Sequence, residues 1–540
     1  MVTADSFPKK FYRVVLILYA PNRKRVLVTR KTMPQALNAL ALHPRRNEFL
    51  DGDERIQVDF IIKKPKPIEQ PLNIEVGIDG LIITGEDGKD HIFMPADCFV
   101  RSIMSMNQLY EYLNRVHGED YVRKASVKTF RTESFISKDD GWLPLYRGYP
   151  IVGDLTKDKL ETAVRLSIDH VKLTQYPNGE FLYYYDAVTD SILEPHRKRT
   201  AENSYYNILR HAGGGLLCLD YEAYTGYGDT KENIVRAIEY LIKSMVVEVV
   251  DGVEQAYVYS ERKAKLGGAG TALYLLARYE LFYGDSTYRV WAERLHQHLL
   301  GQITTSGEFI YYHIYLDNKI TEENNQEYFS FYYPGEALCG IATYMKLLPE
   351  SKRVVGFKKV QSAVHFLLQV RPITHTKHYA SLPSDSWLMM AIEELWDFPE
   401  MRDFEYAQFV FDDARKMIDH MYTEDNALYP DYVGSFYYYY GEHPYPDGAR
   451  LEGVIAAYKL AKKVGNMKLV EALWSAMEQG AWSTLHLVNT PDSTYSVSNP
   501  AITIGGVRLK LTRQWFRIDT IQHVSGFFAK MLPYWEDHQP

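Results

Sequence analysis

The sequence predicts a mainly α-helical protein, an (α/α)6 toroid of twelve helices preceded by a smaller mixed α/β domain. Two observations predict it. A helical periodicity of apolar residues begins after residue 150 and continues almost to the C-terminus. The most apolar of these helices recur at intervals of roughly 60 residues, as expected for a repeat of helical hairpins. We therefore expect a first domain at residues 1–150 and a ring domain at residues 151–540.

The length and the cysteines agree with two domains in a reducing compartment. The chain has 540 residues, of which 46% are hydrophobic, which is more than one ordinary core needs. Its three cysteines, Cys98, Cys218 and Cys339, are far apart and stand among apolar residues. This pattern argues against a disulfide framework and favours the cytoplasm.

Charge and hydropathy exclude two classes of partner. A net charge of −8 disfavours nucleic acid, because phosphate binding requires a concentrated basic surface. The apolar run at residues 14–20 is too short to span a bilayer and is followed by basic residues instead of a cleavage site. We therefore expect neither an export signal nor a membrane span.

The first domain has strand-like and helix-like segments in alternation. Residues 11–20 and 56–63 have the apolar patterns of strands, and Glu86-Asp87-Gly88 is typical of a hairpin turn before another strand. The stretch PKPIEQPLNIEVGIDGLIITGEDGKDHIFMPADCF, followed by a helical pattern at 104–116, resembles the AMMECR-type α/β domain over roughly residues 10–140. Prolines and glycines between residues 141 and 153 mark the domain junction.

The second domain alternates two kinds of helix. The even-numbered helices are apolar or rich in small residues, as at 266–277 and 451–458, whereas the odd-numbered ones are charged on one side, as at 231–244. An inner ring of buried helices inside an outer ring of amphipathic helices satisfies both patterns. The twelve predicted starts lie near residues 158, 203, 231, 266, 286, 333, 353, 384, 403, 449, 467 and 519.

Three segments of this domain resemble repeats of six-hairpin toroid proteins, namely KLGGAGTALYLLARYELFYGD, YYPGEALCGIATYMKL and SDSWLMMAIEEL. The resemblance covers about 380 residues. That superfamily includes unsaturated-uronide hydrolases, other glycoside hydrolases, N-acylglucosamine epimerases, uronate epimerase domains and lanthionine cyclases. The resemblance implies the fold without implying one activity, because such folds host unrelated chemistries.

The candidate site lies where the parallel inner helices begin, because a toroid places these N-termini on one rim. Titratable groups that converge on one concave face are the sequence-level sign of an active site. The catalytic candidates are Asp519, His523, Glu336, Asp385, Glu452 and His211. The candidates for substrate binding are Arg210, Arg450, Arg517, Tyr205, Tyr333 and Trp387. Asp519 and His523 are four residues apart, so both can face inward from one helix.

Several candidates also have a structural interpretation. Glu336 suits the first turn of a helix, where the helix dipole favours an acid. Asp385 suits an N-cap. His211 precedes three glycines, as a buried histidine with satisfied hydrogen bonds would, and Arg517 with Asp519 suits an ion pair.

Missing motifs narrow the chemistry. The sequence contains no His-Glu-x-x-His, Cys-x-x-Cys or Gly-x-Ser-x-Gly motif. We expect His296 and His298 to be solvent-exposed on an outer helix, so no metal and no cofactor is predicted. The glycines at 267, 268 and 270 begin a helix among helices, which indicates close packing instead of a phosphate loop. Acid–base chemistry by carboxylates and histidine remains, as in glycoside hydrolysis and sugar epimerisation.

The sequence therefore predicts a carbohydrate-active enzyme for an acidic, uronic-acid-type saccharide. Its three rim arginines match a carboxylate or sulfate, and its 43 tyrosines supply rings that can stack on sugars. Two alternatives remain open. The ring would modify or cyclise a peptide that the first domain recognises, or it would bind a glycan or a partner without catalysis. The oligomeric state is not predicted.

Overall fold

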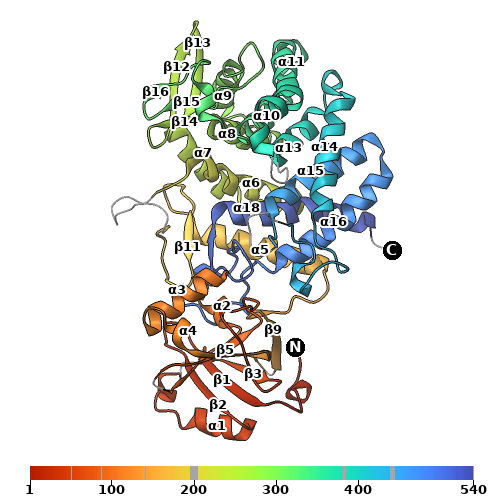
Figure 1. Ribbon diagram of the computed structural model, residues 1–540. Helices are drawn as coiled ribbons and strands as arrows, with labels where there is room; N and C mark the ends of the chain where they lie inside the picture. Colours follow the sequence, from red (N-terminus) through yellow and green to blue (C-terminus); the bar gives the residue numbers. More distant parts are fainter. Residues whose placement is uncertain are drawn as a thin grey trace. The chain divides into compact units, whose positions relative to one another are not determined.

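The computed structural model describes residues 1–49, 52–86, 88–139, 141–194, 205–379, 385–437 and 444–538. Its contacts divide the chain into two compact units (Figure 1). We call residues 1–154, 184–198 and 485–517 the sheet unit, and residues 155–183, 199–484 and 518–540 the ring unit. The first crossing, after residue 154, is close to the predicted boundary at 150. The two later returns to the sheet unit were not part of the predicted division.

The sheet unit contains two antiparallel sheets. The six-stranded sheet has the order β10 (Tyr149–Pro150), β9 (Gly141–Tyr146), β8 (Thr132–Lys138), β3 (Arg55–Ile61), β1 (Arg13–Tyr19) and β2 (Val26–Arg30). The four-stranded sheet has the order β4 (Lys66–Pro67), β7 (Ser126–Phe130), β5 (Gly80–Thr84) and β6 (Asp90–Phe93). Helices α1 (Met33–Ala41), α2 (Asp97–Val100), α3 (Met106–His117) and α4 (Tyr121–Lys124) accompany them. The mixed α/β character predicted for this region is confirmed.

Strand β1 explains why the sequence at residues 14–18 is continuously apolar. Successive side chains of a strand point to opposite faces. Val14, Leu16 and Leu18 pack in one core cluster, whereas Val15 and Ile17 pack in another. Both faces of the strand are buried, so neither carries polar residues.

The returning segment 485–517 completes the core of the sheet unit. The ring of Tyr495 lies 5.3 Å from that of Tyr19, and the buried guanidinium of Arg508 lies 4.7 Å above the ring of Tyr149. Strand β17 (Trp515–Arg517) pairs with β11 (Tyr184–Asp186). These contacts assign the returning residues to the sheet unit although most of the ring unit precedes them in sequence.

Six inner helices form a closed ring, since each packs against the next and the last packs against the first. In order they are α6 (Ile208–Thr225), α8 (Leu266–Tyr283), α10 (Tyr333–Met345), α13 (Ser386–Leu395), α15 (Gly448–Val464) and α18 (Ile518–Met531). In Figure 1 the blue helix α18 lies beside the yellow-green α6, which closes the ring.

Six outer helices alternate with the inner ones along the chain. They are α5 (Lys157–Thr174), α7 (Lys231–Lys243), α9 (Arg289–Gly301), α11 (Glu350–His365), α14 (Phe404–Asp419) and α16 (Met467–Leu485). In the described part of the chain, this arrangement confirms the predicted (α/α)6 toroid. Eleven of the twelve helices begin within three residues of the predicted start. The exception is α6, which begins at 208, while positions 203 and 204 lie outside the described residues.

Glycines allow the inner helices to touch through their backbones. A Cβ atom on Gly270 of α8 would lie 2.6 Å from the backbone of Ala337 in α10, and one on Gly340 would lie 2.4 Å from the carbonyl oxygen of Gly270. Either contact is closer than real Cβ atoms approach. The predicted packing role is therefore confirmed for Gly267 and Gly270 of α8, whereas a Cβ atom on Gly268 would meet only Val258 at 3.9 Å.

Strands inserted between the helices cover one outer helix. The hairpin of β12 (Met245–Val250) and β13 (Val253–Val258) packs on α9, next to a three-stranded sheet of β14 (Lys263–Lys265), β15 (Tyr312–Tyr315) and β16 (Asn318–Lys319). His296 and His298 of α9 are only 4% and 1% exposed. The prediction that these histidines face solvent is wrong, because His298 packs against Tyr257 of the hairpin and His296 packs against Tyr344 of α10. Neither contact is visible in the sequence.

The cysteines and the hydropathy of the helices can be read from the described residues. Cys98, Cys218 and Cys339 are buried and free of disulfides. Among the described residues, no helix is both long and apolar enough to cross a membrane.

Candidate active site

The N-terminal turns of neighbouring inner helices adjoin one another around one rim of the ring. A Cβ atom on a glycine of one helix would clash with the first turns of the next helix at four of these junctions, and an ion pair spans a fifth. The pairs are Gly267 with Glu336, Gly335 with Leu388, Gly453 with Ser386, Gly448 with Val524, and Arg210 with Asp519. The inner helices thus start on the same side, as the toroid requires.

Several candidate side chains gather at this rim. We call Arg210, Lys265, Glu336, Glu452, Asp519 and His523 the rim cluster; ion pairs or electrostatic interactions connect its members. They come from α6, the end of β14, α10, α15 and α18.

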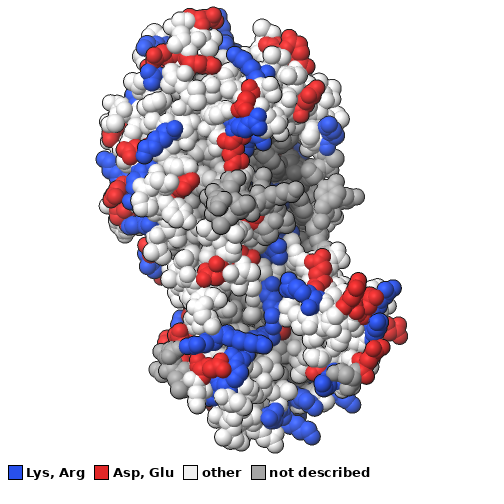
Figure 2. Space-filling view, turned by 90° about the vertical axis from the view of Figure 1, so that its left-hand side faces the viewer, with Lys and Arg blue, Asp and Glu red and all other residues white. Residues whose placement is uncertain are grey.

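On the face of the ring unit drawn in Figure 2, basic and acidic side chains are interspersed, without a broad field of one sign.

His523 is held by a buried carboxylate. Its Nδ1 atom lies 2.6 Å from Oε2 of Glu452, whose other oxygen accepts hydrogen bonds from Gln522 at 2.9 Å and from Lys530 at 2.7 Å. Burial alone would raise the pKa of Glu452, but Lys530 and His523 outweigh it and lower the pKa below its usual value. An ionised Glu452 only accepts hydrogen bonds, so Nδ1 of His523 donates and Nε2 is left for proton transfer.

Glu336 has the opposite electrostatic surroundings. Its side chain is 5% exposed, and burial raises its pKa to about 7, against the smaller lowering effects of Arg210, His523 and Lys265. Its Oε2 has no hydrogen-bond partner among the described residues. This oxygen occupies the space that a side chain at Gly267 would fill. A carboxyl group with a pKa near neutrality can give or take a proton at physiological pH.

Asp519 and His523 both reach the rim cluster but have different partners. Asp519 pairs with Arg210 across α18 and α6 at 3.1 Å, whereas His523 pairs with Glu452 of α15. Their spacing on α18 is the predicted one. The carboxylate that orients the histidine, however, comes from a neighbouring helix instead of from Asp519.

Asp385 occupies a structural position. It is the N-cap of α13, accepting a hydrogen bond from the Leu388 amide at 3.3 Å, and it pairs with the buried Arg371 at 2.6 Å. Arg371, in α12 (Arg371–Thr374), also donates to the hydroxyl of Tyr379 and to the carbonyl of Phe331. This network engages both oxygens of Asp385, as the N-cap interpretation expects.

His211 faces away from the rim cluster. Its Nε2 donates to the carbonyl of Ala237 in outer helix α7 at 2.9 Å, and its Nδ1 accepts from the hydroxyl of Tyr206 at 2.5 Å. Burial lowers the pKa of His211 to about 4. The geometry is that of a buried neutral histidine with both nitrogens bonded.

The three predicted binding arginines have different surroundings. Arg210 keeps a side chain that is 36% exposed at the rim. Arg450, at the start of α15, is buried, lies 3.5 Å from Asp447 and stacks over the ring of Phe436. Arg517 belongs to strand β17 of the sheet unit, where it lies 3.8 Å from Glu194.

The predicted aromatic residues lie at helix starts. Tyr333 is the first residue of α10, with its hydroxyl 3.4 Å from that of Tyr312. Trp387 is the second residue of α13 and packs edge-on against Tyr274 of α8. Tyr205 precedes α6 and contacts the ring of Tyr183. The sequence also has four consecutive tyrosines at 437–440, of which residues 438–440 lie outside the described residues.

A series of buried ion pairs inside the ring was not predicted from the sequence. Lys530 of α18 bridges Glu452 at 2.7 Å and Asp220 of α6 at 3.0 Å, and Asp220 also pairs with Arg278 of α8 at 2.7 Å. Lys530 is a single charge within an apolar stretch of inner helix, and this was the available signal. These buried ion pairs keep Glu452 ionised, and the ionised carboxylate orients His523.

A cavity lies at the opposite end of the ring unit. Its volume is about 590 Å³, and it is lined by α5 and the C-terminal part of α6, including Glu161, Arg165, Tyr221, Tyr224 and Tyr227. The hydroxyl of Tyr224 donates to Glu161. None of the candidates predicted from sequence lines this cavity.

Comparison with known proteins gives likenesses of structure only. No family model and no curated protein sequence matches the chain. It is similar to the solved structure of cellobiose 2-epimerase from Bacillus thermoamylovorans (TM-score 0.48, 10% identity, 70% of this chain and 98% of that one). It is also similar to a family 76 glycoside hydrolase, a mannosidase, from Bacteroides thetaiotaomicron (TM-score 0.47, 10% identity, 71% and 99%) and to a D-mannose isomerase (TM-score 0.46, 13% identity, 70% and 98%).

These likenesses identify no activity for the chain, because the identities and the TM-scores are too low. The resemblances to uronide-acting toroids and to the AMMECR-type domain therefore stay expectations from sequence. The functional argument rests on the geometry of the rim cluster.

Proposed function

We propose that the ring unit is an acid–base enzyme that acts on a saccharide, with His523 and Glu336 as its two proton-transfer groups. The observation that carries the proposal is their contrast within one cluster. His523 is oriented by an ionised Glu452, while Glu336 is buried with a pKa of about 7. An oriented imidazole and a carboxyl group with a pKa near neutrality can supply a base and an acid at one pH.

The same two groups serve either of two reactions. In hydrolysis, protonated Glu336 gives its proton to the leaving oxygen and neutral His523 takes one from the attacking water. In epimerisation, one group removes a proton from a carbon beside a carbonyl and the other returns a proton on the opposite face. The proposal therefore includes both hydrolysis and epimerisation.

An acidic saccharide is the first substrate class to test, and its support comes from Arg210. The guanidinium of Arg210 is partly exposed at the rim, where it can meet a carboxylate. Its pairing with Asp519 offsets part of that charge, and Arg450 is likewise near Asp447. Neutral saccharides are consequently the matched comparison.

The two other functions have less support. A peptide cyclase would need a metal held by cysteine, but Cys339 is buried and its thiol donates to the carbonyl of Trp387 at 3.2 Å. Burial also raises the pKa of that thiol, which disfavours the thiolate form that binds metals. A ring that only binds a glycan does not require a carboxyl group with the raised pKa of Glu336.

The test is a screen of the full-length protein against uronic-acid, sulfated and neutral oligosaccharides in deuterated water, followed by mass spectrometry and NMR. Hydrolysis releases fragments, whereas epimerisation introduces deuterium at one carbon without fragmentation. Loss of the observed reaction in His523→Ala and in Glu336→Gln is expected. Binding without turnover, unchanged in both variants, would support the non-catalytic alternative and contradict the proposal.

A further inference from the structure

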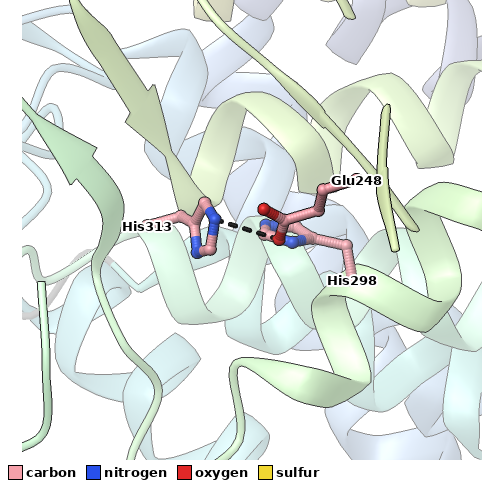
Figure 3. Close-up of side chains that lie close together, drawn as sticks. All are labelled: Glu248, His298 and His313. Atoms are coloured by element: carbon pink, nitrogen blue, oxygen red, sulfur yellow. Dashed lines mark ion pairs between the residues drawn. The ribbon is translucent and has the colours of Figure 1, made fainter. Parts of the chain in front are cut away.

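Three potential metal ligands converge in the ring unit, on elements that the acid–base proposal does not use. Glu248 lies on β12, His298 on α9 and His313 on β15, and Figure 3 shows their side chains pointing toward one another. One ligand atom of each lies within 4.8 Å of the others. Nε2 of His313 is 3.1 Å from Oε1 of Glu248. Neither the helical periodicity nor any motif brings these residues together.

The two histidines are buried, and one of them has an unused nitrogen. Nδ1 of His298 has no hydrogen-bond partner among the described residues, although the side chain is only 1% exposed. Buried polar atoms are normally paired, so this nitrogen requires a reason.

His296 shows that an unpartnered nitrogen alone is not sufficient. It lies two residues earlier on α9, is also buried, and its Nε2 likewise has no hydrogen-bond partner in the described part of the chain. Its ring packs against Tyr344, and it is not one of the three converging ligands. What distinguishes His298 is that a second imidazole and a carboxylate converge on its ring.

We propose that Glu248, His298 and His313 form a binding site for a divalent transition-metal ion, with Zn²⁺ as the preferred ion. Two imidazoles and one carboxylate are a common donor set for zinc, with water in the fourth position. Ligands of a tetrahedral zinc ion lie about 3.3 Å apart, given bond lengths near 2.0 Å. Glu248 is 28% exposed, so its side chain has room to make the small movement required.

The ion would fasten together three parts of the ring unit that are separate in sequence. Each part contributes one ligand. These parts are the β12–β13 hairpin, outer helix α9 and the sheet of β14, β15 and β16. The ring of Tyr257 on β13 covers both histidines, with centroids 5.3 Å from His298 and 4.7 Å from His313. Zinc binding should therefore raise the thermal stability of the ring unit, because a ligand that binds only the folded state stabilises it.

The test uses the full-length protein, stripped with a chelator and then titrated with Zn²⁺ by calorimetry and with Co²⁺ by visible absorption. We expect one equivalent of each metal, a cobalt spectrum of low coordination number and a higher Tm with zinc. Glu248→Gln, His298→Gln and His313→Gln should each weaken zinc binding more than about 100-fold, the upper end of what loss of an outer-shell partner costs.

The matched control is His296→Gln, which removes a buried histidine from the same helix and should leave zinc affinity unchanged. Glu248→Gln is nearly isosteric at a partly exposed position, so it keeps the test valid if the histidine variants fail to fold. Binding of less than one equivalent by the parent, or equal zinc affinity in the parent and Glu248→Gln, would overturn the proposal.

Discussion

The rim cluster and the cluster around His298 both place histidine beside glutamate inside the ring unit, but their surroundings differ. At the rim, Glu452 is held ionised by Lys530, and that lysine is in turn paired with Asp220. Around His298, two buried imidazoles converge with the carboxylate of Glu248, and Nδ1 of His298 has no hydrogen-bond partner among the described residues. A histidine fixed by an ionised carboxylate suits proton transfer, whereas neutral imidazoles that converge with a carboxylate suit a metal ion.

The largest expected effect is that of His523→Ala on turnover. Removing the oriented imidazole should lower kcat by about 10² to 10⁴-fold, the usual contribution of a general acid or base. The measurement is steady-state kinetics on the substrate found by the screen, with the melting temperature of each variant. His296→Gln is the control, since it removes a histidine outside the rim cluster. Equal loss of activity in both variants would remove the distinction between the clusters.

The next effect is on the pH dependence of activity. Glu336 has a pKa of about 7, so its protonated form is lost as the pH rises through neutrality. If it acts as the acid, kcat should fall above about pH 7 in the parent, and Glu336→Gln should be slow at every pH without this limb. A limb that persists in Glu336→Gln would assign the titration to another group.

Glu336 should also make folding stability depend on pH. Its folded-state pKa is above the ordinary value of 4.5, so between about pH 4.5 and 7 the native state binds more protons than the unfolded state. Stability should therefore fall as the pH rises through this window. By linkage the total is at most about 3 kcal/mol. Urea titrations at a series of pH values should show the fall in the parent and a flatter profile in Glu336→Gln.

A smaller effect is expected at the rim arginine. Arg210→Lys keeps the charge but loses the planar fork that can meet both Asp519 and a substrate carboxylate. With an acidic substrate, KM should rise several-fold while kcat changes little. The comparison with a neutral substrate is decisive, because an equal rise in KM for both would contradict an acidic saccharide as the ligand of Arg210.

The smallest effect on catalysis is expected at His211. His211→Ala leaves the carbonyl of Ala237 and the hydroxyl of Tyr206 without their partner. Each buried polar group that loses its hydrogen-bond partner costs about 1–3 kcal/mol of stability, so the melting temperature should drop. Turnover measured below that temperature should stay near that of the parent. A large loss of kcat in a folded His211→Ala protein would return this residue to the catalytic set.

The location of the rim could be predicted from the sequence, because helix periodicity and chain order determine where inner helices begin. Glu336, Asp385, Glu452 and Asp519 stand at or near such starts, so their common rim could be predicted. Their roles could not be predicted, since a carboxylate's partners come from other helices. Arg371 for Asp385 and Lys530 for Glu452 are 14 and 78 residues away in sequence.

The division of the chain shows the same limit. The junction near residue 150 carries a visible proline and glycine signal, but nothing in residues 485–517 indicates that they return to the sheet unit. Tyr495 and Arg508 are buried there against Tyr19 and Tyr149. Cleavage at the junction would therefore leave part of the core of the sheet unit attached to the ring-unit chain.

The sequence by itself determined the mainly helical class, the alternation of apolar and amphipathic helices and nearly all of their starting points, because these depend on local periodicity. Tertiary structure decided which buried charges neutralise one another, which carboxylate orients His523, and that His296 and His298 are buried against Tyr344 and Tyr257. The physical reason is that burial and pairing depend on neighbours distant in sequence. The same aspartate, glutamate or histidine is therefore a cap, a proton donor or a metal ligand according to what packs against it.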